Sequence, residues 1–293
     1  MAAKIQCRAN DADKHEYDIN SVIFHKGKLY SAADDGKIMQ WTQDLKKVCE
    51  VQSNPCSVFC LAANDTSLYS CSNEGTVKSF ELDTLKLKNV LLQDNQTEFW
   101  RLCCDGDRLY VGDHQGTIKV FKKEQLYGNL NISEPVKDMQ MHGNLMFTAN
   151  MDIIVTDLKL GSDKLQFGTK CTFAGRAPIA LIGDEFVAFG STDATGVAVH
   201  ENNDASHFKA VSKTPGAHDR IINALAGWGR QDGHVLFSGG WDKTLKAWRI
   251  EPDRLAPIVS CEVGFVINAI AVGEGRHVYV GGGDGNLAKI LLE

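Results

Sequence analysis

The sequence is poor in proline and holds no long apolar run, and both shortages narrow the choice of fold. Six prolines stand against 27 glycines in 293 residues, a balance that indicates many tight turns, as in an all-β protein with short strands. No stretch approaches the roughly 18 apolar residues that a membrane helix needs. The opening residues Met1–Ile5 also lack the apolar run of a signal peptide. We therefore expect a soluble protein with no membrane partner.

An excess of positive charge is also missing. The chain has 31 Lys and Arg residues against 37 Asp and Glu residues, a formal net charge of -6. Nucleic acids and anionic membranes both reward a concentrated basic surface, so the balance argues mildly against either as the main partner. Hydrophobic residues make up 43% of the chain, which is ample for a large core and excludes a disordered protein.

The nine cysteines form no recognisable framework. Their number is odd and their spacings match no disulfide pattern. Cys56 and Cys60, like Cys103 and Cys104, lack the paired spacing and the nearby histidines of a zinc site. We therefore interpret them as small core residues and expect a reduced, intracellular protein, cytoplasmic or nuclear, with no metal and no cofactor.

One segment recurs along the whole chain: three short apolar runs separated by polar turns, the third run ending in a large residue. The clearest copies, Leu29–Trp41 and Leu236–Trp248, align without a gap. Weaker copies are Leu68–Phe80, Leu109–Phe121, Met146–Leu158, Ala188–His200 and Val278–Ile290. The period of about 40 residues is that of a four-stranded propeller blade, and seven copies fill the chain.

An apolar run with little alternation precedes each copy, as expected of an innermost strand buried between neighbouring blades. These runs are Ile19–Phe24, Val58–Ala62, Trp100–Cys104, Val136–Met141, Ile179–Ile182, Ile222–Ala226 and Ile267–Val272. The last blade ends on its third strand, Asn286–Ile290, and the segment Lys4–Arg8 can supply the fourth. This pairing would close the ring without an exposed edge. The sequence thus predicts an all-β fold, one seven-bladed β-propeller domain over residues 1–293.

These residues resemble the WD40-repeat family over essentially the whole chain. A hallmark of that family is a hydrogen-bonded tetrad of His, Ser or Thr, Asp and Trp within one blade. The matching residues are His15, Ser31, Asp35 and Trp41 in the first blade and His218, Ser238, Asp242 and Trp248 in the sixth. The same residue types occur in a Ser-His-Asp catalytic triad, but the resemblance implies a sealed structural cluster in which the serine meets an indole. Thr42 and Arg249 depart from the Asp that usually follows the Trp, and the other five blades lack a full tetrad.

The resemblance also implies a docking face, where the loops entering the innermost strands meet the turns between second and third strands. Candidates on this top face are Tyr17, Asp34, Asn73, Phe99, Trp100, His114, Met151, Arg176, Asp193, Arg220, Trp241 and Phe265. Aromatic residues and Arg suit interface anchors. Trp241 is the foremost candidate, and Arg220 is expected to form an aromatic–cation pair with it. Two alternatives stay open: Trp241 packs on neighbouring loops, or Trp100 begins the buried strand.

Catalytic patterns are scarce. Gly281–Gly285 looks like a phosphate loop, but no Lys-Ser or Lys-Thr pair follows it. Only Asp34, Asp193 and Asp284 could converge on the channel, as in a propeller hydrolase. We therefore expect no enzyme but a scaffold that binds a peptide or partner protein, monomeric by itself or part of a larger complex. The alternatives are a propeller that binds a small ligand or glycan, and a ubiquitin-ligase substrate receptor. For the latter, Trp248–Glu251 lacks the Trp-Asp-x-Arg motif of cullin-4 adaptor receptors.

Overall fold

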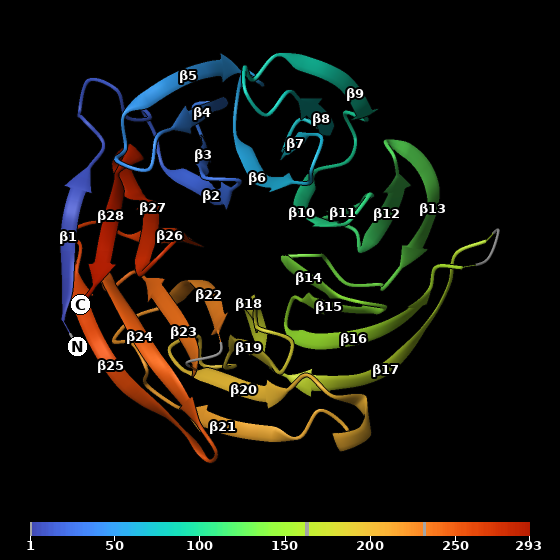
Figure 1. Ribbon diagram of the computed structural model, residues 1–293. Coiled ribbons are helices and arrows are strands. Elements are labelled where there is room, and N and C mark those ends of the chain that lie inside the picture. Colours follow the sequence, from blue (N-terminus) through green and yellow to red (C-terminus); the bar gives the residue numbers. More distant parts are fainter. Residues whose placement is uncertain (1, 162–163, 231–232) are drawn as a thin grey trace.

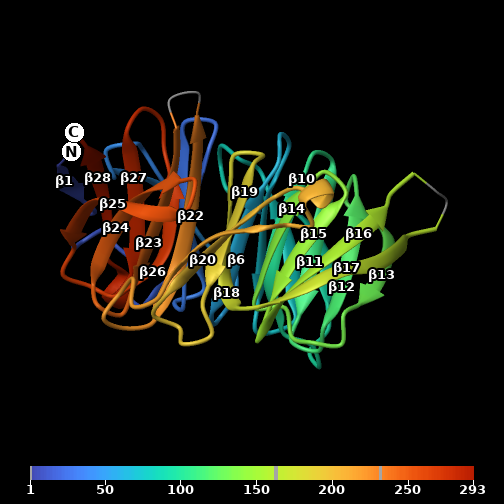
Figure 2. The same ribbon diagram turned by 90° about the horizontal axis from the view of Figure 1, so that it is seen from below.

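A computed structural model describes residues 2–161, 164–230 and 233–293, and these residues form a ring of seven blades around a central channel (Figure 1). Each blade is a four-stranded antiparallel sheet. Besides the strands, the described residues contain two short 3-10 helices, η1 (Asp204–Ser206) and η2 (Gly283–Gly285). The strands run between the two faces of the disc, and loops cover both faces (Figure 2). The predicted all-β, seven-bladed propeller is confirmed.

The strands fall into four groups by their place in the blade, from the channel outwards. The innermost strands are β2 (Ile19–His25), β6 (Val58–Ala63), β10 (Phe99–Asp105), β14 (Asp138–His142), β18 (Arg176–Ile182), β22 (Ile222–Arg230) and β26 (Ile267–Val272). The second strands are β3 (Lys28–Ala33), β7 (Leu68–Ser72), β11 (Arg108–Asp113), β15 (Leu145–Ala149), β19 (Phe186–Gly190), β23 (Gly233–Gly240) and β27 (His277–Gly282).

The third strands are β4 (Lys37–Trp41), β8 (Thr76–Phe80), β12 (Thr117–Lys122), β16 (Asp152–Lys159), β20 (Val197–Glu201), β24 (Thr244–Glu251) and β28 (Leu287–Leu292). The outer strands are β5 (Lys47–Gln52), β9 (Leu87–Gln93), β13 (Gln125–Asn131), β17 (Gln166–Ala174), β21 (Ala210–Thr214), β25 (Arg254–Glu262) and β1 (Ala3–Arg8). Blades 1 to 6 begin at β2, β6, β10, β14, β18 and β22, and blade 7 consists of β26, β27, β28 and β1.

The ring closes in blade 7, where the first strand of the chain pairs with the last. β1 runs antiparallel to β28, with Ile5 opposite Ile290. The two chain ends lie side by side (Figure 1), and backbone hydrogen bonds of 3.1 and 2.8 Å join Ala2 and Glu293. Arg8 reaches further, to the carbonyl oxygen of Val263 in the loop that leads out of blade 6, at 2.8 Å. The closure that the sequence predicts for Lys4–Arg8 is confirmed.

The core lies between the blades rather than inside any one of them. Phe237 and Leu245 of blade 6 pack in one cluster with Ile267 and Val280 of blade 7, and all four are buried. Burial of an aromatic or aliphatic side chain contributes about 1.5–3 kcal/mol. Each blade therefore depends on its neighbours for stability, which fixes the innermost strands around one channel.

The tetrad residues of blades 1 and 6 meet as hydrogen-bonded clusters. In blade 6 the Trp248 indole donates to the Ser238 hydroxyl at 2.9 Å, and Ser238 lies 2.7 Å from Nε2 of His218. His218 Nδ1 lies 2.8 Å from the Asp242 carboxylate. A carboxylate only accepts, so Nδ1 carries the proton and Nε2 accepts from the serine. The indole N–H donates to the same hydroxyl. Each buried polar group of these four side chains therefore has a hydrogen-bond partner.

Blade 1 repeats this arrangement with almost the same geometry. The Trp41 indole lies 2.8 Å from Ser31, Ser31 lies 2.7 Å from His15, and His15 lies 2.9 Å from Asp35. Burial opposes ionisation of Asp35, but hydrogen bonds from His15 and from two backbone N–H groups lower the pKa of its carboxyl. In both blades the cluster ties the loop before the innermost strand to the turn after the second strand, and so fixes the top of the blade.

The shared serine of the tetrad carries a testable prediction. Ser238→Ala leaves the buried Trp248 N–H and His218 Nε2 without a partner, and each such group costs about 1–3 kcal/mol. We expect the free energy of unfolding, measured by urea denaturation, to fall by at least about 2 kcal/mol. The matched control is Ser212→Ala, because the buried Ser212 hydroxyl makes no hydrogen bond to the described residues. Equal losses in both variants would contradict the role given to the tetrad.

Candidate functional site

The top face of the disc is the end at which the innermost strands begin. There the turn between second and third strands lies against the loop that enters the innermost strand. In three blades a backbone N–H of the turn donates to a backbone carbonyl oxygen of the loop, at 2.9 to 3.1 Å. The pairs are Asp34 with Asp18, His114 with Glu98, and Trp241 with Ile221. This repeated bond brings two loops of every such blade together around the channel mouth.

A register shift follows the first residue of six innermost strands, and it leaves two residues unpaired in β18 but a single residue in each of the other five. The five single residues are Asn20, Phe59, Trp100, Asn223 and Asn268. A β-bulge leaves one residue unpaired and re-aims its side chain. All five line the channel or its mouth. One small backbone irregularity, repeated around the ring, thus supplies most of the residues of the candidate site.

The channel mouth is a cavity of about 310 Å³ with two unlike walls. Its lining residues are Asn20, Phe59, Trp100, Arg101, Lys137 and Asn268. Blades 2 to 4 supply two aromatic rings and two cations, whereas blades 7 and 1 supply two amides. The Trp100 indole donates to the Glu98 carboxylate at 2.8 Å, and its ring centre lies 6.2 Å from that of His114.

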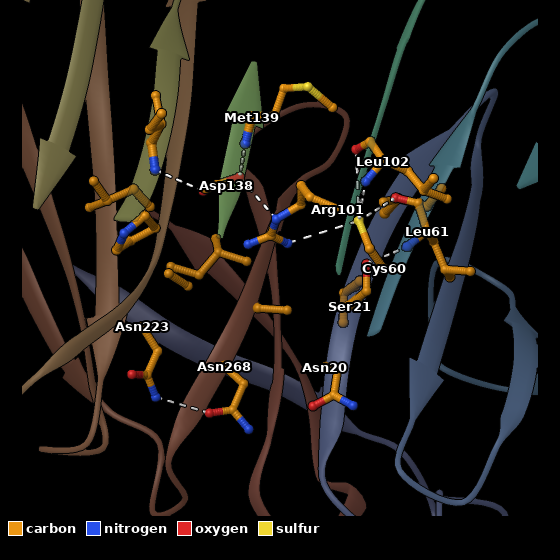
Figure 3. Close-up of a pocket in the computed structure, with 18 of the residues that line it drawn as sticks. Asn20, Ser21, Cys60, Leu61, Arg101, Leu102, Asp138, Met139, Asn223 and Asn268 are labelled. Atoms are coloured by element: carbon orange, nitrogen blue, oxygen red, sulfur yellow. Dashed lines mark hydrogen bonds and ion pairs between the residues drawn. The ribbon is translucent and has the colours of Figure 1, made fainter. Parts of the chain in front are cut away.

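A deeper cavity of about 210 Å³ shares Asn20, Arg101 and Asn268 with the mouth (Figure 3). Arg101 lies between Asp138 and Cys60 in this view. Its Nε is 3.1 Å from the Asp138 carboxylate, which also accepts the N–H of Ile179 at 2.8 Å. Burial opposes the charge of Arg101, yet the neighbouring carboxylate raises the pKa of the guanidinium above its ordinary value. Arg101 is therefore a fixed, permanent cation.

Three side chains connect the innermost strands of neighbouring blades. Ser21 Oγ accepts the N–H of Leu61 at 3.1 Å, and Asp138 accepts that of Ile179. Cys60 Sγ accepts the N–H of Leu102 at 3.5 Å. Each bond satisfies a backbone donor that the bulge or the strand edge leaves unpaired, so these contacts hold the channel wall in register.

The top-face candidates from the sequence fall into three groups, and the first consists of exposed side chains outside the local loop contacts. Trp241 keeps 51% of its surface, and Tyr17 and Met151 are exposed as well. Ile221, which the sequence reasoning missed, is exposed beside Trp241. Arg220 is exposed on the same loop, but no cation–π contact between it and Trp241 is found among the described residues.

A second group is buried and corrects the expectation that Phe99 and Phe265 are surface anchors. Phe99 is fully buried, because it precedes the bulge and its side chain packs in the core between blades 2 and 3. Trp100, one residue later, turns into the mouth and is half-buried. Phe265 packs between blades 6 and 7, with the Arg8 guanidinium 5.7 Å from its ring centre.

The third group is engaged in local structure. Asp34 accepts from the amide of Asn20 at 2.7 Å, and Asp193 accepts two backbone N–H groups of its own turn at 3.0 Å. His114 is half-buried beside Glu98, and Asn73 accepts from the Cys56 thiol. These contacts stabilise the loops. They also occupy side-chain oxygens that could otherwise accept hydrogen bonds from a partner on the top face. Arg176 is half-buried at the start of β18.

The residues that the sequence reasoning missed are Phe59, Arg101, Lys137, Asn20 and Asn268. For Asn20, Phe59 and Asn268 a signal was available as a position rather than as a motif, whereas Arg101 and Lys137 do not stand at a bulge. Each bulged residue directly follows the first residue of its innermost strand, so an alignment of the strands places them in one column. Among the described residues no group of three or more metal-ligating side chains is found, and no described helix is long and apolar enough to cross a membrane.

Comparison with known proteins gives one family match and several distant relatives. Residues 209–249 match the family described as WD domain, G-beta repeat. A protein of Lotus japonicus named as an E3 ubiquitin-protein ligase, LIN-1, is 21% identical over 94% of this chain and 19% of its own length. The ribosome biogenesis protein WDR12 homolog of Trichoplax adhaerens is 21% identical over 93% of this chain and 63% of its own length.

The chain thus spans less than two thirds of either relative. Among solved structures, the WD40 β-propeller domain of Doa1 superposes with a TM-score of 0.79 over 99% of this chain and 97% of that chain, at 16% identity. At this identity the likeness concerns the fold alone.

The Asp138–Arg101 pair gives a prediction about the channel wall. Asp138→Asn removes the anion that offsets a half-buried guanidinium. Breaking a fully buried pair costs roughly 3–5 kcal/mol, but the Arg101 side chain keeps 27% of its exposure, so we expect a loss of about 1–3 kcal/mol in urea denaturation. The control Asp184→Asn alters a carboxylate that is 95% exposed and should leave stability unchanged. An unchanged midpoint for Asp138→Asn would contradict the pairing.

Proposed function

We propose that this chain, a seven-bladed β-propeller of the WD40-repeat type, is a protein-interaction scaffold that binds a peptide or loop of a partner at the mouth of its channel. One observation carries the proposal: five β-bulges at equivalent positions turn aromatic and amide side chains into the channel and its mouth. Bulges are concentrated next to functional sites because they re-aim side chains at little expense to the sheet.

The chemistry of the mouth suits a peptide. Trp100 and Phe59 offer flat apolar faces, and Arg101 and Lys137 offer charged donors at their side. Aromatic residues and Arg dominate the energetic centres of protein interfaces. On the opposite wall the Asn268 amide N–H can donate to a peptide backbone, and the Asn20 amide oxygen can accept from one, because the Asn20 N–H groups already donate to Asp34 and Val58. The arrangement favours a peptide segment that inserts an apolar or acidic side chain into the mouth. The backbone of that segment would then lie beside the Asn20 and Asn268 amides.

The rim extends this surface beyond the mouth. Tyr17, Met151, Ile221 and Trp241 are large exposed apolar residues on the top loops of blades 1, 4 and 6. Their spread around the ring supports a partner broad enough to cover the mouth and reach several blades. Because Asp34 and Asp193 are engaged in loop contacts, the face is better suited to binding than to hydrolysis, and we propose a role without turnover.

The relatives support a role inside a larger assembly. One is named for ribosome biogenesis and the other as a ubiquitin ligase, and each is longer than the segment it shares with this chain. We propose that residues 1–293 act as a single propeller domain within such an assembly. The ribosome-biogenesis name favours the nuclear over the cytoplasmic compartment.

The proposal predicts that partner capture depends on the top face. We expect Trp100→Ala and Trp241→Ala each to weaken capture of the same proteins from native lysate by about thirtyfold, the effect of a lost anchor of about 2 kcal/mol. The measurement is quantitative mass spectrometry of proteins retained by immobilised wild type and variants. Phe167→Ala is the control, because Phe167 is an exposed aromatic residue on outer strand β17.

Three results would change the interpretation. If all variants retain the same proteins equally, the top-face site is wrong. If only Phe167→Ala loses them, the docking surface lies on the outer strands. If a glycan array shows binding that Trp100→Ala abolishes while no protein is captured, the mouth is a small-ligand site instead.

A further inference from the structure

Two cysteines of blade 2 lie opposite each other beneath the mouth of the channel. Cys60 lies in β6 and lines the deeper cavity, and Cys71 lies directly opposite it on β7. Opposite residues of an antiparallel pair have Cα atoms about 4.5–5.5 Å apart, within the range of about 4.4–6.8 Å that a disulfide spans. Both side chains are buried in the protein, and Cys60 meets the open volume of the cavity.

The surroundings of Cys60 favour its ionised form. Its sulfur accepts the N–H of Leu102 at 3.5 Å, and Arg101 Nη1 lies 3.9 Å away. The Asp138 carboxylate binds Nε of the same guanidinium, so that Nη1 points toward the Cys60 sulfur (Figure 3). A cation and a backbone donor stabilise a thiolate more than a thiol. No other side chain described in the channel wall combines a nucleophile with such partners.

The pKa values of the two thiols are shifted in opposite directions. A hydrogen bond from Cys71 lowers the pKa of Cys60, against the effect of burial and with help from the charge of Arg101. Burial and the neighbouring Cys60 raise the pKa of Cys71. Of the two thiols, Cys60 therefore has the lowered pKa and Cys71 the raised one. In blade 3, by contrast, burial raises the pKa of Cys103 to about 12.

We propose that Cys60 is a modification site for small electrophiles, chiefly peroxides, that enter through the channel mouth, with Cys71 as its resolving partner. The Cys60 sulfur attacks one oxygen of hydrogen peroxide, the O–O bond breaks, and hydroxide leaves, giving a sulfenic acid at Cys60. Cys71 then attacks the Cys60 sulfur, the S–O bond breaks, and the hydroxyl leaves with the proton of Cys71 as water. The product is a Cys60–Cys71 disulfide, and the two electrons lost by the sulfurs have reduced the peroxide.

The reactivity of Cys60 does not depend on the proposed scaffold function. A purely structural role for Cys60 would match that of Ser21, which stands one residue after its own bulge and accepts the N–H of the next blade. Such a role explains the hydrogen bond to Leu102 but not the aim of Arg101 at the sulfur. It also supplies the control: Cys60→Ser keeps an acceptor for Leu102 and should preserve the fold.

The first experiment measures alkylation of each cysteine by iodoacetamide from pH 5 to 9, with peptide mapping by mass spectrometry. We expect the rate at Cys60 to reach half its maximum well below the pH of about 8.5 at which an ordinary thiol does so. Arg101→Gln should move that midpoint upward and slow labelling at neutral pH by about threefold to tenfold, the effect of up to one pKa unit. An ordinary midpoint in the wild type, or one that Arg101→Gln leaves in place, overturns the proposal.

The second experiment treats the reduced protein with hydrogen peroxide and maps the products. Wild type should form the Cys60–Cys71 disulfide, whereas Cys71→Ser should instead keep a sulfenic acid at Cys60 that dimedone traps. Cys60→Ser should give neither product while melting at the wild-type temperature. If wild type and Cys71→Ser give the same trapped sulfenic acid, the resolving role is wrong. If Cys60 is oxidised no faster than Cys103, the modification site is wrong.

Discussion

The pairing of β1 with β28 is the constraint on which the rest of the molecule depends. Because the hydrophobic core lies between blades, each blade buries its faces only if it has a neighbour on both sides. Blade 7 would lack its outer strand, and the ring its closure, without the segment Ala3–Arg8. Closure in turn fixes where the seven innermost strands meet, and therefore the width and lining of the channel. The candidate site is a consequence of the ring rather than of any single blade.

Within that ring, the β-bulge is the local irregularity that turns side chains of a structural strand into the channel mouth, where we propose that a partner binds. The residue before the bulge stays in the core, as Phe99 does, and the residue at the bulge turns into the mouth, as Trp100 does. The residue after it connects to the next blade, as Ser21 and Cys60 do. Three successive positions thus differ in what they contact: the core, the channel mouth and the next blade. Arg101 combines two of them, since it lines both cavities and is held by Asp138 of the next blade.

The sequence was sufficient to predict the blades, because a repeat of about 40 residues with alternating strands leaves few other architectures. It also placed the closing strand, and the resemblance to the WD40-repeat family predicted the cluster of His218, Ser238, Asp242 and Trp248. The site was harder to predict. Phe99 and Trp100 have the same composition signal, and only the register shift between β10 and β11 decides which one is buried. Arg101 and Lys137 belong to no motif, since their place in the mouth arises from three blades that meet in space.

The seam in blade 7 has a consequence for how the molecule is made. Within the propeller β1 is synthesised before every other strand and its partner β28 after all of them, so β1 must wait unpaired until the strands of all seven blades have emerged. Contacts between residues this far apart in sequence give the fold a high contact order, and such topologies fold slowly. During synthesis β1 and the incomplete ring both expose strand edges that invite pairing with other chains. The emergence of β28 therefore decides when the ring can close and its strand edges are protected from aggregation.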